Sequence, residues 1–254
     1  MPTFLNQTMV LIFGHGQFIL TSFHEGLVMT TVLVTGCDFG IGFEFARQYA
    51  SAGWRVHAIC LDSSSRENID ALAGDTHFHQ LDVSDAASLG ALAARLHGEP
   101  VDLLINNAAT FAPDGPGTLM LPDIEEFTRV MRVNAVAPLY VANAFEAHVA
   151  THRGTMAFIS TRSGSIGDNS SGGHYAYRCS KAALNMAVKS LSLDLAPQGI
   201  VTVALHPGSV RTETRKGGQV PVEESVRGMR DVIAALDPAR SGAFLRFDGG
   251  NIEW

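Results

Sequence analysis

Tyr177 and Lys181 are the two residues whose types and spacing most directly suggest chemistry. They lie four residues apart in a run that predicts a helix, so their side chains share one helix face. A nearby ammonium group favours the phenolate and moves a tyrosine pKa down from its ordinary value of about 10. Such a phenol can protonate a carbonyl oxygen or deprotonate an alcohol. The spacing would equally suit a packed tyrosine beside a solvated lysine, so the rest of the chain must decide.

A glycine-rich run at 35–42 (Thr-Gly-Cys-Asp-Phe-Gly-Ile-Gly) separates a predicted strand from a predicted helix. Glycines at this place let the backbone turn tightly and approach a pyrophosphate held at the helix N-terminus. The spacing G-x-x-x-G-x-G is not the commoner dinucleotide pattern, and ordinary turn chemistry would also explain it. The predicted dinucleotide contacts in this run are Gly36, Asp38, Phe39, Gly40, Ile41 and Gly42.

Continuous apolar strands alternate with helical patterns along the rest of the chain. Strands are predicted at 31–35, 55–60, 76–81, 101–105, 155–160, 200–205 and 243–247, and helices at 40–52, 86–96, 123–149, 175–196 and 222–236. This alternation indicates one α/β domain, a Rossmann-like doubly wound parallel sheet of about seven strands covered on both faces. Ligands of such sheets bind at the strand carboxyl ends, so residues 110–120, 162–171 and 211–220 are the expected pocket walls.

Residues 1–28 differ from the rest of the chain. They contain no Lys or Arg, and their apolar run is too short for a secretory signal. A strand-rich run begins directly after Met29. We therefore expect the folded domain to span 29–254, with 1–28 either a loose extension or the product of a start codon assigned too early.

Composition excludes several classes of function. The 254 residues are 46% apolar and 17% charged, with a net charge of −7, which argues against a nucleic-acid surface. No apolar run approaches the roughly 20 residues that cross a bilayer. Three separated cysteines in apolar contexts are typical of reduced thiols in a cytoplasmic protein. His77 and His79 share a strand face without a third ligand at a telling spacing, so no metal site is predicted.

Five motifs together resemble the short-chain dehydrogenase/reductase superfamily. They are the glycine loop, residues 106–109 (Asn-Asn-Ala-Ala), Asn134, the Tyr177/Lys181 pair, and Pro207 with Gly208, in that family's order. The resemblance runs from about residue 31 to 254. The segments 164–185 and 206–212 and the closing residues look most like the branch of C-factor and the sniffer-type carbonyl reductases. The resemblance implies an oxidoreductase that uses NAD or NADP on a small-molecule carbonyl or alcohol.

The resemblance also implies catalytic roles. Tyr177 matches the general acid/base, Lys181 the lysine that binds the nicotinamide ribose, and Asn134 the asparagine that holds a water in a proton relay. Thr161 stands where the family usually has the serine that hydrogen-bonds the substrate oxygen. Threonine keeps that serine's donor and acceptors and adds a methyl group that stiffens χ1. Nearby Ser160, Ser163 and Ser165 are expected to cap backbone instead.

Further cofactor contacts follow from the resemblance. The implied residues are Asn107, Ala108 and Ala109 on the cofactor side, Asp82 and Val83 at the adenine, and Pro207, Gly208, Val210 and Thr212 at the nicotinamide. Asp82 could instead cap the helix that begins near Asp85. Ala109 replaces a common glycine, which matters only if the backbone there needs a positive φ.

The sequence leaves the choice between NAD and NADP open. An acid near the end of the second strand favours NAD, and an arginine there accommodates a 2′-phosphate. Cys60 and Leu61 occupy those two positions. Asp62 favours NAD, but related proteins carry an acid there beside the arginine. Arg66 is the nearest candidate for a phosphate.

A second functional interpretation is a dinucleotide-binding signalling protein with weak or no turnover. The C-factor resemblance would allow it, and the threonine at 161 is its support in the sequence. An interaction-only scaffold is a third. Related proteins pair through helices that match 123–149 and 175–196, and others are monomers, so a homo-oligomer stays open.

Overall fold

A seven-stranded parallel sheet organises the molecule. The computed structural model describes residues 10–14, 17–21, 30–112, 119–213 and 216–254. The sheet contains β3 (Thr31–Thr35), β4 (Arg55–Cys60), β5 (Thr76–Gln80), β6 (Leu103–Asn106), β7 (Thr155–Ile159), β8 (Val201–His206) and β11 (Ala243–Arg246). Its order is β11-β8-β7-β6-β3-β4-β5, and every pairing is parallel. The predicted doubly wound sheet is confirmed.

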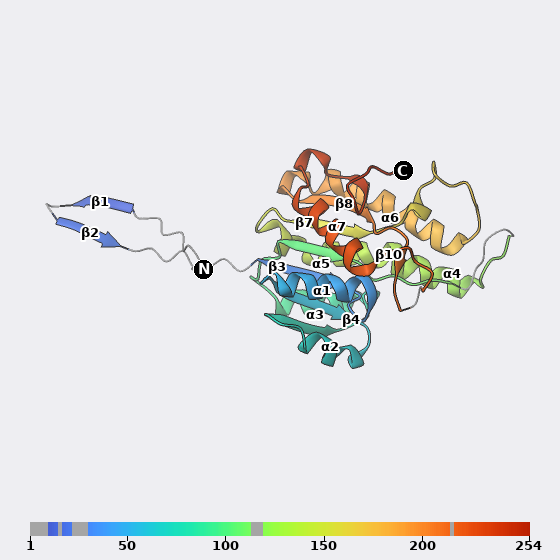
Figure 1. Cartoon of the computed structure of the whole chain (residues 1–254), viewed down its shortest axis with the longest axis horizontal. Helices are drawn as coiled ribbons and strands as arrows, with labels where there is room; N and C mark the ends of the chain where they lie inside the picture. Colours follow the sequence, from blue (N-terminus) through green and yellow to red (C-terminus); the bar gives the residue numbers. More distant parts are fainter. Residues whose placement is uncertain (1–9, 15–16, 22–29, 113–118, 214–215) are drawn as a thin grey trace.

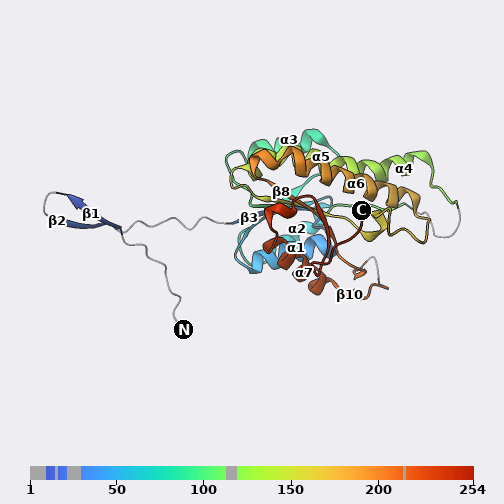
Figure 2. The same ribbon diagram turned by 90° about the horizontal axis from the view of Figure 1, so that it is seen from above.

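Helices cover both faces of the sheet (Figures 1 and 2). One face carries α1 (Gly40–Ser51), α2 (Arg66–Asp70) and α7 (Val222–Ala234), and the other carries α3 (Ala86–Arg95), α5 (Ala137–Ala150) and α6 (Tyr175–Asp194), with α4 (Ile124–Met131) preceding α5. Each face has its own apolar core, one around Phe45 and Met229 and the other around Phe145 and Leu184. Strands buried on both faces read as continuous apolar runs, which is why they could be predicted.

The order in which strands are added to the sheet reverses between two neighbouring strands, β3 and β6. From β3 it moves outward to β4 and β5, then returns to place β6 on the other side of β3. The loops that leave β3 and β6 diverge at their carboxyl ends, which is where open α/β sheets bind ligands. This point lies between the glycine loop and residues 106–109.

The long helix predicted at 123–149 is a continuous segment with one widened turn. α4 and α5 are joined by a π-helical turn, η2 (Arg132–Val136), which contains Asn134. Pro138 has no N–H, so the usual α-helical bond from residue 138 to the Asn134 carbonyl is absent. Single π turns of this kind are frequent at functional sites.

Several short elements were not predicted. They are the antiparallel pair β1 (Val10–Gly14) and β2 (Gln17–Thr21), the parallel pair β9 (Val210–Arg211) and β10 (Val220–Pro221), and the 3₁₀ turns η1 (Ser63–Ser65), η3 (Arg162–Gly164), η4 (Ala196–Gln198) and η5 (Pro238–Arg240). Such pieces are too short to show a period. Met29, the expected start of the domain, lies outside the described residues, so that boundary stays a prediction. Within the described ranges, no helix combines the length and apolar character that crossing a bilayer requires.

Candidate active site

Tyr177 and Lys181 lie one turn apart on α6, as their spacing predicts. The Lys181 side chain is 2% exposed, and its Nζ donates to the Ile159 carbonyl at the end of β7, at 2.9 Å. Burial lowers the pKa of Lys181 to about 8, because the charged form loses its hydration. The Tyr177 ring stacks on that of Phe111, which belongs to the loop after β6.

Asn134 fastens the loop after β6 to α6. Its Oδ1 accepts from the Thr110 N–H (2.7 Å), and its Nδ2 donates to the Thr110 carbonyl (2.8 Å) and to Ser180 Oγ (3.0 Å). Ser180 Oγ in turn donates to the Tyr177 carbonyl at 2.8 Å. Asn134 is fully buried, and both of its amide hydrogens are engaged. Its side chain therefore positions Thr110 and α6.

Thr161 and Ser160 are used differently. Ser160 is buried, and its Oγ donates to Asn185 Oδ1 at 2.6 Å. Thr161 lines the cavity beside Tyr177, and its Oγ1 accepts from the Ser163 N–H at 3.2 Å. Ser160 lines the same cavity, but it gives its hydroxyl hydrogen to Asn185, whereas Thr161, in the family's serine position, accepts with its hydroxyl oxygen.

The glycine loop is packed too tightly for side chains. A Cβ on Gly36 would lie 2.8 Å from Ala108 Cα, and one on Gly42 would lie 2.0 Å from the Gly36 carbonyl oxygen. Gly36 and Gly40 also have φ values of +70° and +60°, a region that favours glycine. The backbone itself therefore forms the surface that a ligand would approach at the N-terminus of α1.

Asn107 ties this loop to its neighbour. Its Nδ2 donates to the carbonyls of Thr35 (3.0 Å) and Gly36 (3.1 Å). Thr35 Oγ1 accepts from the N–H groups of Asn107 and Ala108 in return. Ala109 is not strained, because Arg153 and His174 are the non-glycine residues with positive φ in the described part of the chain.

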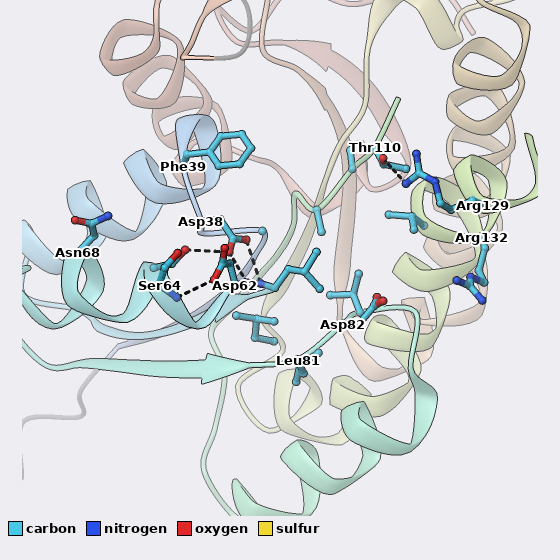
Figure 3. A pocket seen from close by; sticks show the side chains of 18 residues that line it. Asp38, Phe39, Asp62, Ser64, Asn68, Leu81, Asp82, Thr110, Arg129 and Arg132 are labelled. Carbon is cyan, nitrogen blue, oxygen red and sulfur yellow. Dashed lines mark hydrogen bonds between the residues drawn. The ribbon is translucent and has the colours of Figure 1, made fainter. Parts of the chain in front are cut away.

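A cavity of about 580 Å³ lies between the ends of β3, β4 and β6 (Figure 3). Predicted residues that line it are Gly36, Asp38, Phe39, Asp62, Asp82, Val83, Ala108 and Ala109. Asp82 Oδ1 accepts from the Ser84 N–H at 2.8 Å, while Asp85 caps α3, so the alternative role of Asp82 as the helix cap is wrong. Residues that sequence reasoning missed are Ser64, Ser65, Asn68, Arg129 and Arg132.

A second cavity of about 210 Å³ continues from the first, sharing Phe39 and Ala109. Predicted residues that line it are Gly40, Ile41, Asn107, Thr161, Tyr177, Lys181, Pro207, Gly208, Val210 and Thr212. Of the predicted residues, Asn134 and Gly42 line neither cavity. Asn134 hydrogen-bonds Thr110, and Gly42 packs against Gly36, and both of these partners line the first cavity. Phe111 also lines this cavity, from within the expected wall 110–120, of which residues 113–118 lie outside the described residues.

A third cavity of about 800 Å³ shares Thr161 and Gly208 with the second. Its walls come from the two other predicted segments and from residues 246–253. Arg162 pairs there with Asp168, and Arg246 pairs with Asp248 at its edge. Residues 214–215 of the expected wall lie outside the described residues.

The three clustered histidines sit away from these cavities. His57 Nδ1 lies 3.0 Å from His79 Nε2, and His57 stacks on His77. Among the described residues, no group of three or more His, Cys, Asp or Glu side chains is arranged to hold a metal ion.

Comparison with known proteins agrees with this geometry. The family model described as short chain dehydrogenase matches residues 30–219. C-signal of Myxococcus xanthus is 43% identical over 163 residues, covering 61% of this chain and 93% of that protein. The solved structure of the carbonyl reductase Sniffer of D. melanogaster has a TM-score of 0.82 at 27% identity, covering 89% of this chain and all of that one.

A further structure is that of an NADPH-bound carbonyl reductase from chicken fatty liver. It has a TM-score of 0.79 at 32% identity, covering 90% of this chain and all of that one. The family model spans well over half of the chain, and the C-signal and Sniffer similarities match the predicted branch. The chain belongs to the short-chain dehydrogenase family, on the side of C-signal and the sniffer-type carbonyl reductases.

Proposed function

We propose that this chain is an NAD(P)-dependent oxidoreductase that transfers a hydride between a nicotinamide and the carbonyl or alcohol carbon of a small molecule. The observation that carries the proposal is that Tyr177, Lys181 and Thr161 line one cavity, which continues into the cavity of the glycine loop. A proton-transfer group and a dinucleotide-sized site are thereby adjacent.

The residues present suit a dinucleotide. The glycine backbone at the start of α1 offers N–H groups and no side-chain obstruction to a pyrophosphate. Asp82 and Val83 would hold the adenine, and Pro207, Gly208, Val210 and Thr212 the nicotinamide end. When bound, the nicotinamide supplies or accepts the hydride. Support also comes from the chicken carbonyl reductase, whose structure holds NADPH.

Three side chains would handle the substrate oxygen and its proton. Tyr177 donates a proton to that oxygen in reduction and removes one from the alcohol in oxidation. Lys181 provides the positive charge that favours the phenolate, and its buried Nζ can also donate to a ribose hydroxyl. Thr161 Oγ1 uses a lone pair on the Ser163 N–H, so its hydroxyl hydrogen can be donated to the substrate oxygen.

The walls favour a carbonyl compound with an apolar group next to the reacting carbon. Phe111, Ile159 and Val210 line the second cavity, and the polar third cavity leaves room for the rest of the molecule. The intact Tyr177 and Lys181 pair is the reason for preferring an enzyme over a signalling protein without turnover.

Oxidation of NADH and NADPH over a panel of aldehydes, ketones and quinones tests the proposal, with Tyr177→Phe as the matched variant. We expect turnover by the wild type and a loss of about 10²- to 10⁴-fold in the variant, which keeps the ring and removes the proton donor. Inertness of the wild type over the whole panel, with a nucleotide still bound, would overturn the enzyme proposal in favour of the signalling interpretation.

A further inference from the structure

The Asp38 carboxylate bridges the glycine loop to the end of β4. Its Oδ1 accepts from the Asp62 N–H at 2.9 Å and from Ser65 Oγ at 3.0 Å, and its Oδ2 accepts from the Leu61 N–H at 3.1 Å. All three donors belong to residues 61–65, in the segment that follows β4. The carboxylate from the glycine loop therefore accepts hydrogen bonds from three donors of the segment after β4.

Dinucleotide-binding sheets contact the adenosine ribose at this end of the first cavity. The residue that contacts the ribose 2′ position comes from the end of the second strand, about 20 residues after the glycine loop. Cys60 ends that strand here and Leu61 follows it, and neither side chain is charged. Asp62 lines the same end, and its carboxylate accepts from the Ser64 N–H at 2.8 Å, which lowers the Asp62 pKa and keeps it ionised. Two carboxylates thus lie at the end of the cavity where the ribose 2′ position would be.

Positive charge lies elsewhere in the cavity. Arg129 and Arg132 are the basic residues among the described ones that line it, and Figure 3 shows both across the cavity from Asp38 and Asp62. Arg66, the nearest basic residue in sequence, stacks over an aromatic ring of β5 and is not part of the lining. No guanidinium or ammonium of the described lining stands beside the two carboxylates.

We propose that this chain selects NAD(H) over NADP(H) and that Asp38 is the residue that sets the choice. The inference rests on the proposed function, because it assigns the coenzyme of that same site. A 2′-phosphate carries roughly two negative charges, and the carboxylates of Asp38 and Asp62 would repel it. It would also find the N–H groups of Leu61 and Asp62 already used. A ribose 2′-hydroxyl can instead donate to either carboxylate, in a charge-assisted hydrogen bond.

Binding measurements on the full-length chain test this without turnover. NADH and NADPH are each titrated into the protein, and the dissociation constants are read from nicotinamide fluorescence and from calorimetry. We expect NADH to bind about 100-fold more tightly than NADPH. Asp38→Asn keeps the side-chain size and one acceptor oxygen, and should tighten NADPH about tenfold with little effect on NADH. Adding Leu61→Arg to it should reverse the preference.

Asp70→Asn is the matched control. Asp70 is an exposed carboxylate on α2 that pairs with Arg66 outside the cavity, so its removal should leave the NADH-to-NADPH ratio unchanged. The inference is overturned if the wild type binds NADPH as tightly as NADH, or if folded Asp38→Asn keeps the wild-type ratio. Should Asp38→Asn unfold, Asp38→Ser, which also removes the carboxylate, should narrow the NADH-to-NADPH ratio instead, and an unchanged ratio in that variant overturns the assignment to Asp38.

The two proposals fail in different ways. Tight NADH binding without turnover on any carbonyl would overturn the oxidoreductase proposal and still support the choice of coenzyme. Binding of neither nucleotide would overturn the proposed function and this inference together.

Discussion

The ring of Phe111 lies against the phenol ring of Tyr177, with ring centroids 4.3 Å apart and ring planes inclined by 25°. Phe111 is 63% exposed, so the stack forms one wall of the second cavity at its opening to solvent. An exposed phenylalanine on the residue proposed to move the proton has a direct bearing on which substrates reach it.

Replacing Phe111 should change specificity more than stability. Phe111→Ala removes the ring that would pack against an apolar substrate and steady the phenol, a contact of about 0.5–1.5 kcal/mol. We expect kcat/KM for aromatic carbonyls to fall about 3- to 10-fold relative to that for small aliphatic aldehydes. Phe111→Leu should retain most of the activity. Equal losses on both substrate types would argue that the ring supports Tyr177 alone.

Replacing Thr161 and replacing Ser160 should have different effects on kcat. Thr161→Ala removes the donor proposed for the substrate oxygen, and kcat should fall by about 10²-fold or more. Thr161→Ser restores the hydroxyl without the methyl group and should equal or exceed the wild type. Ser160→Ala is the control, since it leaves Asn185 without its donor and should cost about 1–3 kcal/mol of unfolding free energy with kcat retained. Unchanged kcat in Thr161→Ala would remove Thr161 from the mechanism.

The buried Lys181 should lower the stability of the folded protein while being needed for turnover. Its pKa is about 8 in the folded protein and about 10.5 in the unfolded chain, so the unfolded state holds the proton more strongly. The stability of the wild type should therefore rise as the pH increases from 8 to 10.5. Below pH 8 the buried charge costs about 3 kcal/mol, partly offset by the bond to Ile159.

Urea unfolding of Lys181→Met checks this balance. At pH 7 the variant should lack turnover and be more stable than the wild type by about 1–2 kcal/mol, and the difference should shrink toward pH 10. Lys189→Met, at an exposed position of the same helix, should stay within about 0.5 kcal/mol at both pH values. A less stable Lys181→Met at pH 7 would contradict the burial cost.

The His57 and His79 pair should make the protein sensitive to acid. Burial lowers the pKa of His79 to about 4 and also lowers that of His57, whereas both titrate near 6.5 when unfolded. The unfolded chain therefore binds more protons below pH 6.5, and stability should fall between about pH 6.5 and 4.

Replacing His79 tests that expectation. His79→Gln can still hydrogen-bond His57 and should reduce the loss of unfolding free energy between pH 7 and 4.5 by about 1–2 kcal/mol, allowing for partial solvent exposure. His97→Gln, at an exposed position, is the control. A pH dependence identical to that of the wild type would show that the pair does not govern acid unfolding.

The fold could be predicted because its strands are buried on both faces. Runs such as residues 31–35 leave no polar face to disguise them, and Gly53 marks the end of α1. The π turn was missed because periodicity cannot distinguish a five-residue turn within a long helix. Pro138, four residues after Asn134, was the available signal.

Site residues that belong to sequence motifs could be predicted. Site residues that come together only through tertiary contacts could not. The glycine loop, Tyr177 and Lys181 can be identified from their spacing in the sequence. The meeting of Asp38 with the N–H groups of Leu61 and Asp62 depends on how the β3 loop lies against β4, and no local pattern records it. Arg129 and Arg132 were missed for the same reason, since a helix face becomes a cavity wall only once the helix is placed.

The hydrogen bonds between Asn107 and the glycine loop also bear on how a ligand binds. Because Asn107, Thr35 and Gly36 are already joined across β3 and β6, the loop loses its conformational entropy when the chain folds and not when a ligand arrives. A ligand entering this site therefore meets a rigid surface, and more of its contact energy remains as affinity. Asn107→Ala should weaken binding through a looser loop, even though the rest of the lining is intact.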